Sequence, residues 1–573
     1  MDRPAPRYLW QLRSRPVLDP DFLAAGQARG LSRRLLGVLA ARGHSDGHAL
    51  TAFLDEPIAG LHDPLLLPDA RVFAERVEAA RGRGERVLVF GDFDADGLTG
   101  LAIMVLSLRR LGLDVEPHVP SRADEGHGLS LAAISRTVEE ERGLIVTVDC
   151  GTSSALEIEA ARLAGVDVLV TDHHQLPSVL PQALALVNPH RPDSAYPDRH
   201  LAGSGVAFKL AQLLLGDEAL EMADLAAIGT VADVAPIVGE NRSIVRLGLE
   251  RLRTDPRPGL AALLARAGVA PARVDLDRLA FAVAPRLNAV GRVGDGTRAA
   301  HLLLATDAEE AAALADELEA ANLLRRELLA VALVEAREAA LAEPDAPLSI
   351  IAGEWPVGII GLIAGRLADE RGRPHVVFST SATPWRGSAR SPGGFDLAAS
   401  FAQLADIFER FGGHAAAAGC DLAPERYEDF RRRLLSLSGP LTPVEPELLL
   451  DLAITAPEAD YTLLRELALL EPAGVGNPPP LVGVAGFEVV RVRAASGGHT
   501  QLVLRRGLEV VDGICFGRED LAADVREGDR VDVVARLSSR VFGGFETLQL
   551  EIRDVGPAGT LERLTAPPAV LVA

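Results

Sequence analysis

Short apolar runs alternate with helix-like segments between about residues 86 and 187. This alternation is typical of a parallel β-sheet wrapped by helices. We therefore predict an α/β fold for a first large domain, residues 81–305, preceded by an N-terminal helical segment, residues 1–80. The expected strands of the sheet are residues 86–90, 114–120, 144–148, 167–170 and 184–187.

The pattern further along predicts a long helix, a second α/β domain and a β-barrel. The helical stretch 306–344 opens with Thr306-Asp307-Ala308-Glu309, a capping box, and stops at a proline. At about 1.5 Å per residue it is roughly 55 Å long, enough to connect two lobes. Alternating apolar residues with glycine turns then predict the barrel. The expected bounds are 345–440 for the smaller α/β domain, 441–481 for a linker, 482–560 for the barrel and 561–573 for a C-terminal tail.

Acidic and imidazole side chains follow three of the predicted strands. Because the carboxyl ends of parallel strands share one edge of a sheet, where ligands bind, these side chains should meet in one cleft. A further carboxylate, Asp233, closes a helix rich in alanine and leucine. The residues that follow the strands are Asp92, Asp94, Asp96, Asp149, Asp172, His173 and His174.

Each of these features also has an ordinary explanation. The segment 91–97 (GDFDADG) begins like an EF-hand calcium loop, but Ile103 stands where a bidentate glutamate is required and a β-type run precedes the segment. Solvated aspartates in a turn are the alternative, although three carboxylates after a buried strand repel one another unless a cation neutralises them. An aspartate at a strand end, as at Asp149, is often a cap or turn former. His173 and His174 could form a surface pair.

Composition narrows the classes of protein. The chain has 573 residues, 48% of them hydrophobic, which indicates a globular protein of several domains. Charged residues break every long apolar run and the N-terminus lacks a signal-peptide core, so we expect a cytoplasmic protein with no membrane association. Three widely spaced cysteines exclude a disulfide framework and a CxxC zinc site. The net charge of −22 argues against nucleic-acid binding through overall positive potential, but bound cations and local arginines can reverse the field at a site.

Taken together, the carboxylates and imidazoles suit two divalent cations, and Mn²⁺ matches such a mixed ligand set best. Paired cations usually activate a water molecule against a phosphoester. The sequence therefore indicates a metal-dependent phosphoesterase.

The order and spacing of these motifs resemble those of the DHH phosphoesterases, and the second half of the chain resembles their RecJ-type members. The resemblance covers nearly the whole chain from about residue 80. It implies a DHH domain, a DHHA1 domain and an oligonucleotide-binding barrel, in an enzyme that degrades single-stranded DNA from its 5′ end to 5′-mononucleotides in recombination and repair. The motifs that carry it are GDFDADG, VTVDCG, TDHH and GTVADV, followed by PRLNAVGR, GEWPVGIIGLIAGRL, GSARS and GGHAAAAG.

The resemblance also implies roles for single residues. Asp94 and Asp149 should hold one cation, Mn²⁺ or Mg²⁺, with support from Asp92. Asp149 should bridge to a second cation, and His174 should contact the scissile phosphate or orient a ligand. The other expected ligands of the second cation are Asp96, His173 and Asp233.

A second set of residues should bind the 5′-terminal phosphate or the nearby backbone. The resemblance assigns this role to Arg122, Arg292, Ser388, Arg390 and His414. A guanidinium is suited to such bidentate contacts. His414 has an alternative as a packed histidine at a helix C-terminus, because Gly412 and Gly413 also read as a C-cap.

Arginines and phenylalanines of the barrel are expected to form a strand-binding surface, without one outstanding residue. The chain departs from the family pattern at two positions, Pro356 after Trp355 and His127 in the segment 126–129. The barrel residues are Arg491, Arg493, Arg505, Arg506, Phe516, Phe542 and Phe545.

Two other functions stay open: a DHH phosphodiesterase of short oligonucleotides or cyclic dinucleotides, and a non-catalytic scaffold on DNA. The extended barrel argues against the first and the complete ligand set against the second. The family resemblance implies single-stranded DNA as substrate, and a single-strand-binding protein and a RecQ-like helicase as partners.

Overall fold

The computed structural model describes most of the chain and divides it into two compact units. One unit contains residues 60–444, and the other joins residues 1–59 to residues 445–573. The described residues are 5–14, 16–55, 57–121, 125–126, 128–342, 346–439, 447–542 and 545–565, without the side chains of 541, 542 and 565.

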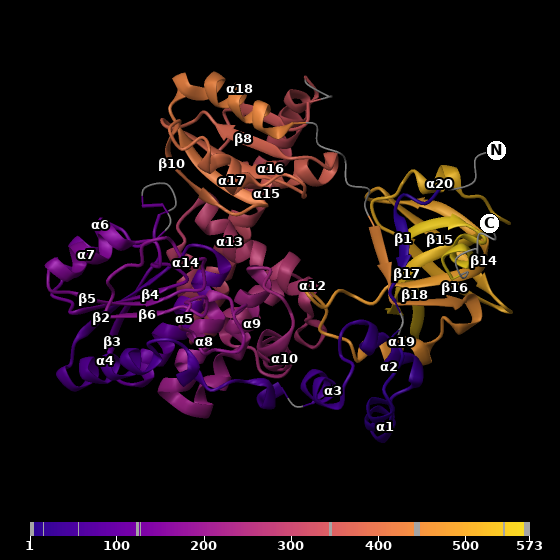
Figure 1. The fold of residues 1–573 in the computed structure, drawn as a ribbon, viewed down its shortest axis with the longest axis horizontal. Coiled ribbons are helices and arrows are strands. Elements are labelled where there is room, and N and C mark those ends of the chain that lie inside the picture. The colour runs from indigo at the N-terminus through magenta and orange to yellow at the C-terminus, as the bar shows by residue number, and fades with distance from the viewer. Residues whose placement is uncertain are drawn as a thin grey trace, which may run out of the picture. The chain divides into compact units, whose positions relative to one another are not determined.

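The first domain of the larger unit is built on a parallel sheet of five strands (Figure 1). Every neighbouring pair in the order β3-β2-β4-β5-β6 is parallel, as the sequence predicts. Because β3 lies on one side of β2 and β4 on the other, the strand order reverses between β2 and β4, which is where ligands bind in such sheets. The strands are β2 (Arg86–Gly91), β3 (Asp114–His118), β4 (Leu144–Val148), β5 (Asp167–Thr171) and β6 (Ala185–Val187).

Helices cover both faces of this sheet. One face packs on α4, α5 and α8, and the other on the shorter α6 and α7. Almost every residue of α5 is buried, because α8 and α9 also pack against it. The helices are α4 (Ala70–Arg83), α5 (Ala95–Arg110), α6 (Leu131–Glu139), α7 (Ala155–Leu163), α8 (Gly203–Leu215), α9 (Ala223–Ala232), α10 (Gly239–Thr254), α11 (Pro258–Arg266), α12 (Leu276–Arg278), α13 (Ala284–Val293) and α14 (Thr297–Leu304).

A single long helix, α15 (Ala308–Leu341), connects this domain to the next. Its N-cap is Asp307, whose carboxylate accepts from Glu309 N and Glu310 N, so the capping box expected at Thr306 is wrong. The helix buries Leu314 and Leu318 in the first domain's core and Leu333 and Ala336 in the core of the second. It thus contributes apolar residues to both cores.

The second domain has a mixed sheet in the order β10-β11-β9-β8-β7. Only the pair of β7 and β8 is parallel, and the other neighbours are antiparallel. Its elements are β7 (Ser349–Gly353), α16 (Val357–Arg371), β8 (His375–Ser379), β9 (Trp385–Arg390), α17 (Leu397–Ala402), β10 (Phe408–Gly413), β11 (Ala417–Leu422) and α18 (Tyr427–Ser438).

The smaller unit contains the predicted barrel. Five strands close on themselves because β14 pairs with both β15 and β17, and β13 adds to β14 in parallel. The elements of this unit are β1 (Leu9–Leu12), α1 (Pro20–Ala28), α2 (Arg33–Ala41), α3 (Gly47–Leu54), β12 (Glu447–Leu450), β13 (Leu452–Thr455), α19 (Tyr461–Ala468), β14 (Val482–Ala495), β15 (His499–Arg506), β16 (Glu509–Cys515), α20 (Leu521–Asp524), β17 (Arg530–Phe542), β18 (Phe545–Pro557) and α21 (Thr560–Thr565).

The N-terminal segment folds with this barrel. Strand β1 pairs in parallel with β12, and the indole of Trp10 donates to Asp554 over 2.8 Å. Arg42 donates two hydrogen bonds of 2.8 Å to the buried carboxylate of Asp451. The order of elements along the chain did not indicate this pairing of its two ends.

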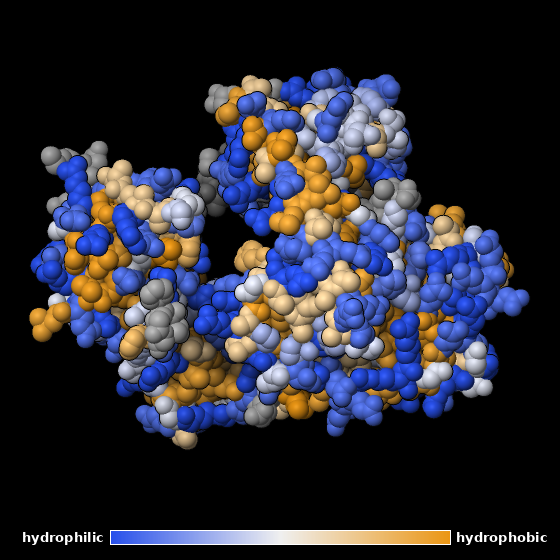
Figure 2. Space-filling model, turned by 180° about the vertical axis from the view of Figure 1, so that it is seen from behind, coloured by the Kyte–Doolittle hydropathy of each residue, from blue (hydrophilic) through white to orange (hydrophobic). Residues whose placement is uncertain are grey.

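The face of the molecule in Figure 2 is mostly hydrophilic, with apolar residues in smaller areas among the polar ones. No helix in the described ranges is long and apolar enough to cross a membrane.

A fully buried ion pair lies behind the edge of the first sheet. Lys209 of α8, the single lysine of the chain, places its ammonium 2.9 Å from Glu240 of α10. The same ammonium donates to His62 O over 2.7 Å and to Gln212 Oε1, while Tyr196 donates its hydroxyl hydrogen to Glu240. Burial lowers the pKa of Lys209 and Glu240 opposes this shift. These contacts fix α8, whose first turn reaches the candidate site.

We expect Lys209→Met to lower the free energy of unfolding by about 3–5 kcal/mol, because it leaves the Glu240 carboxylate buried without its cation. Urea unfolding of the wild type and the variant measures the difference. The double variant Lys209→Met, Glu240→Gln should recover a large part of the loss. If the loss of unfolding free energy in the double variant equalled the sum of the losses in the two single variants, Lys209 and Glu240 would not interact.

Candidate metal centre

Three aspartates follow β2 at the point where the strand order reverses. Asp94 is the N-cap of α5, and its Oδ1 accepts from Asp96 N at 3.0 Å and Gly97 N at 3.1 Å. Asp96 accepts from the first turn of α8, from Gly203 N at 2.7 Å and Ser204 N at 2.9 Å. The N-terminal ends of two helices therefore hold these carboxylates, which favours their charged form.

Asp149 follows β4 with a backbone conformation that is uncommon for residues other than glycine. Its φ is 61°, in the left-handed region, where a residue with a side chain is strained by about 1–3 kcal/mol. The side chain is 3% exposed. A Cβ atom at position 203 would lie 2.5 Å from Asp149 Oδ1, so only glycine leaves room for this carboxylate. Strain of this kind concentrates at functional sites.

His173 and His174 follow β5, next to the fully enclosed carboxylate of Asp172. His174 Nδ1 lies 2.7 Å from Asp172 Oδ1, and the backbone N–H groups of both histidines donate to the same oxygen. Asp172 Oδ2 accepts from Thr152 N at 2.9 Å. Asp172 therefore orients the imidazole of His174 and fixes the backbone of both histidines.

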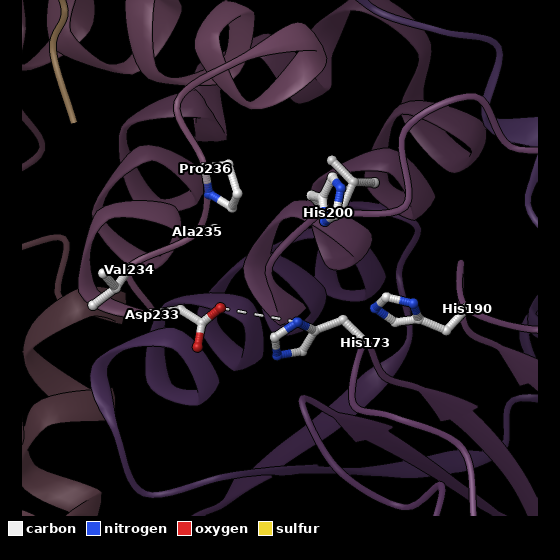
Figure 3. A pocket seen from close by; sticks show the side chains of 8 residues that line it. His173, His190, His200, Asp233, Val234, Ala235 and Pro236 are labelled. Carbon is white, nitrogen blue, oxygen red and sulfur yellow. Dashed lines mark ion pairs between the residues drawn. The ribbon is translucent and has the colours of Figure 1, made fainter. Parts of the chain in front are cut away.

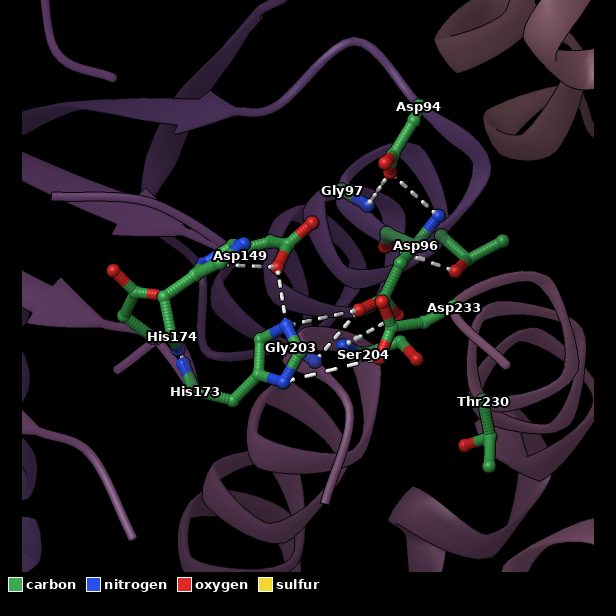
Figure 4. Close-up of polar contacts among 12 residues, drawn as sticks. Asp94, Asp96, Gly97, Asp149, His173, His174, Gly203, Ser204, Thr230 and Asp233 are labelled. Carbon is green, nitrogen blue, oxygen red and sulfur yellow. Dashed lines mark hydrogen bonds and ion pairs between the residues drawn. The ribbon is translucent and has the colours of Figure 1, made fainter. Parts of the chain in front are cut away.

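Asp233 is the C-cap of α9, as the sequence predicts. The next residue, Val234, has a φ of 62°, which is a strong outlier for a β-branched side chain. The turn directs Asp233 toward His173, whose Nδ1 lies 3.9 Å from Asp233 Oδ2 (Figure 4).

These side chains meet at one place, and His173 lies at its middle (Figure 4). His173 Nε2 is 3.1 Å from Asp149 Oδ1 and 3.8 Å from Asp96 Oδ2. Within each of three overlapping groups among the described residues, the potential ligand atoms lie within 4.8 Å of one another. The groups are Asp92, Asp94 and Asp149; Asp96, His173 and Asp233; and Asp149, His173 and His174.

Burial and mutual repulsion make these carboxylates reluctant to ionise. Burial, followed by the charges of Asp92 and Asp96, raises the pKa of Asp94 to about 6. Burial and the charge of Asp96 raise the pKa of Asp233 to about 7, and burial with the same neighbour raises the pKa of Asp149 well above its usual value.

The two histidines are shifted toward their charged forms. Burial alone would lower the pKa of His173, but the charges of Asp96 and Asp233 outweigh it and raise the pKa. Burial is likewise outweighed at His174, where the hydrogen bond to Asp172 raises the pKa to about 9. The same bond, with the charge of His174, lowers the pKa of Asp172 against the effect of burial.

The donor set fits Mn²⁺ or Mg²⁺. The buried Oδ1 of Asp149 accepts no hydrogen bond from the described part of the chain, although buried polar atoms are rarely left so. Carboxylate oxygens with one or two imidazoles are ligands for such cations, and a bound cation would remove the repulsion that raises the carboxyl pKa values.

Residues that hold the ligands from behind were missed by reasoning from the sequence. Asn188 donates to His174 O over 2.9 Å, and Asn288 Oδ1 accepts from Ala95 N at the start of α5 over 2.6 Å. Asn288 lies within the PRLNAVGR motif. A polar residue inside a predicted helix could have indicated that its side chain has a structural partner. Asn188 follows β6, so the rule that picked out the other strand ends would have found it.

Three of the expected phosphate-binding residues lie around the first turns of α16. Arg292, at the end of α13, donates to Gly358 O over 3.0 Å. A Cβ atom at Gly361 would lie 3.2 Å from Ser388 Oγ and 3.4 Å from Arg390 Nη2, so both β9 side chains adjoin this helix. Arg390 also donates to Ala389 O over 2.8 Å. Pro356 is the N-cap of α16, directly after the buried Trp355.

The other two expected phosphate ligands are not part of this group in the described structure. Arg122 lies outside the described residues, as does His127. His414 lies in the exposed turn between β10 and β11, where its backbone pairs with Ala417. Gly412 and Gly413 end strand β10, so the alternative of a helix C-terminus is wrong.

The barrel residues expected to bind single-stranded DNA differ in their exposure and in their contacts within the protein. Arg493 donates to Gln501, Arg505 pairs with Glu488, and Arg506 pairs with Glu509. Arg491 is exposed, and so are Phe516 and Phe545, whereas the side chain of Phe542 lies outside the described atoms.

Three family models match the chain in this order. The DHH family N-terminal domain matches residues 86–230, the DHHA1 domain residues 347–437 and the RecJ OB domain residues 450–554.

Whole proteins match over most of their length. The single-stranded-DNA-specific exonuclease RecJ of Bacillus subtilis is 35% identical over 90% of this chain and 67% of its own length. The protein of the same name from Escherichia coli is 32% identical over 96% of this chain and 99% of its own length.

Solved structures of RecJ proteins also resemble this chain. RecJ from Thermus thermophilus in complex with Mn²⁺ aligns with a TM-score of 0.82 at 31% identity, over 96% of this chain and 79% of that one. The structure of the same protein with Mg²⁺ gives a TM-score of 0.77.

The metal-free protein should lose stability as the pH rises from about 5 to 8. The carboxyls of Asp94 and Asp233 have a pKa of 3.8 when unfolded but about 6 and 7 when folded, so the stability from their protonation is present below pH 3.8 and is lost as the pH passes these higher values. The raised pKa of His174 acts in the same direction. Thermal unfolding in a chelator measures the change.

The double variant Asp94→Asn, Asp233→Asn should show a smaller loss, and the exposed Asp369→Asn the wild-type loss. Mn²⁺ at about 100 times its Kd should stabilise the wild type by about 2.7 kcal/mol at pH 8. If the double variant lost as much stability with rising pH as the wild type, Asp94 and Asp233 would not be the groups responsible.

Proposed function

The chain belongs to the RecJ family of single-stranded-DNA-specific exonucleases, and we propose that it degrades single-stranded DNA from the 5′ end to 5′-mononucleotides, using two cations. The observation that carries this direction is the position of the phosphate-binding set. Gly291, the residue before Arg292, packs on Phe93, since a Cβ atom there would lie 2.9 Å from Phe93 O. A terminal phosphate held by Arg292, Ser388 and Arg390 would therefore lie beside the cation groups.

The protein residues have separate tasks in this reaction. Bound cations would activate a water molecule and stabilise the charge on the phosphoryl oxygens. Asp96 is held by two backbone N–H groups of α8, so it cannot swing away when a cation leaves. His174 uses Nδ1 on Asp172, which leaves Nε2 of this half-exposed ring to donate to the scissile phosphate.

The bond from phosphorus to the 3′ oxygen of the terminal nucleotide breaks as the water oxygen bonds to phosphorus. The shortened strand then carries a new 5′ phosphate. The same recognition can repeat at the next nucleotide, which suits an enzyme that moves along one strand.

We also propose that the enzyme acts in recombination and repair in the cytoplasm, with a single-strand-binding protein and a RecQ-like helicase as partners. The family membership supports this role. The closed barrel, which the RecJ OB domain model matches, supports a long single strand over a short oligonucleotide as substrate.

A single-stranded oligonucleotide labelled at either end tests the reaction with Mn²⁺. We expect the 5′ label to appear at once as a mononucleotide while the 3′ label moves down a ladder. Asp149→Asn should lower kcat by at least about 100-fold, since it removes a charged ligand shared by two groups. Asp369→Asn serves as the control. Cleavage of short oligonucleotides only, or binding without cleavage, would favour the phosphodiesterase or the scaffold instead.

Arg390→Ala and Arg292→Ala should each lower kcat/KM for a 5′-phosphorylated strand by about 10- to 100-fold, because a charged hydrogen bond to phosphate is lost. The effect on a strand with a 5′ hydroxyl should be much smaller. Arg366→Ala, an exposed change on α16, the helix that Arg390 and Arg292 adjoin, should leave both rates unchanged. Equal losses on both strands would argue against recognition of the terminal phosphate.

A further inference from the structure

A pocket of about 210 Å³ opens beside the cation group that contains His173 and Asp233. At about 30 Å³ per water molecule, the space holds roughly seven waters, enough for a phosphodiester group. Two of its lining residues, His190 and His200, have no assigned role, and Figure 3 shows their imidazoles facing the same space as that of His173.

The backbone fixes both histidines in place. His190 N donates to Asn188 Oδ1 over 2.9 Å, and the same Asn188 donates to His174 O. His200 N donates to Asp198 Oδ1 over 2.9 Å. Asn241 donates to His200 O over 2.6 Å. His190 is therefore linked to His174 through Asn188, and His200 is held by Asp198 and Asn241.

The imidazoles themselves are available for a ligand. Within the described ranges of the chain, neither ring makes a hydrogen bond. Each ring carries an N–H donor, and a cation held by the adjoining group of His173 and Asp233 would add positive charge beside it. Hydrogen-bond donors with nearby positive charge are suited to an anion.

The position of the pocket indicates which anion the two histidines would bind. Arg292 adjoins the loop of Asp92 and Asp94, whereas the pocket adjoins His173 and Asp233 of the other group. A strand bound across both groups, with its terminal phosphate at Arg292, would continue past the scissile bond toward the pocket. The next group of negative charge along the strand is the following phosphodiester.

We propose that His190 and His200 bind the phosphodiester immediately 3′ of the scissile one and so position the strand for each cut. The proposal rests on the proposed function. It assigns to this chain a subsite that a substrate fills only when it has at least two internucleotide phosphates.

Cleavage of a 5′-phosphorylated trinucleotide and of the corresponding dinucleotide, with Mn²⁺, tests the subsite. Only the trinucleotide has a phosphodiester beyond the scissile one, so the wild type should have a higher kcat/KM for it. His190→Ala and His200→Ala should each lower this value by about tenfold, as expected for one charge-assisted hydrogen bond, and should change that of the dinucleotide less than twofold. His301→Ala, at an exposed position on α14, is the control.

A neutral methylphosphonate at the second internucleotide position separates contact from general damage. It should slow the wild type about as much as the double variant His190→Ala, His200→Ala is slowed on the natural trinucleotide, and should not slow that variant further. Mn²⁺ binding and thermal unfolding should match the wild type.

The outcomes separate this inference from the proposed function. A wild type that cleaves neither substrate would overturn the proposed function. A wild type that cleaves both at equal efficiency, or variants that lose both activities equally, would overturn the subsite alone.

Discussion

The repulsion between buried carboxylates at the reversal of strand order is the constraint on which the rest of the structure depends. Asp92, Asp94, Asp96 and Asp149 are brought together by parallel strands that could not avoid placing them at one edge. The protein offsets part of this cost with the N–H groups of α5 and α8 and with the imidazole of His173, whose Nε2 lies 3.1 Å from Asp149 Oδ1. The pKa values of Asp94 and Asp149 nevertheless stay raised, so a cation is the favourable neutralising group.

This arrangement explains how a chain with a net charge of −22 acts on a polyanion. Bound cations would neutralise the negative charge of the site and would also contact the substrate. The donors that we propose for the terminal phosphate, Arg292, Ser388 and Arg390, lie around the first turns of α16. The charge of the whole chain is consequently a poor guide to the field at the site.

The sequence predicted most of the fold because the signals were local. The strands of the first sheet follow from short apolar runs, and the site follows from what comes after each run. Asp233 was predicted from a helix end in one motif. Other features depend on contacts between distant segments: Asn188 behind His174, and the pairing of Trp10 with Asp554 that brings the N-terminus to the barrel. Such contacts leave no periodic pattern. The helix C-terminus considered for His414 was wrong for a different reason, since Gly412 and Gly413 serve a strand end as readily as a helix end.

One helix, α13, keeps the two functional parts in register. Asn288 accepts a hydrogen bond from the first residue of α5, which carries Asp96, and Gly291 packs on Phe93. One residue later, Arg292 donates to the first turn of α16, where a Cβ atom at Gly358 would lie 2.1 Å from Arg292 O. About one turn of helix separates these contacts, so α13 joins the loop of the cation groups directly to the start of α16, beside which Ser388 and Arg390 lie. The proposed cut one nucleotide from the end would depend on that short spacing.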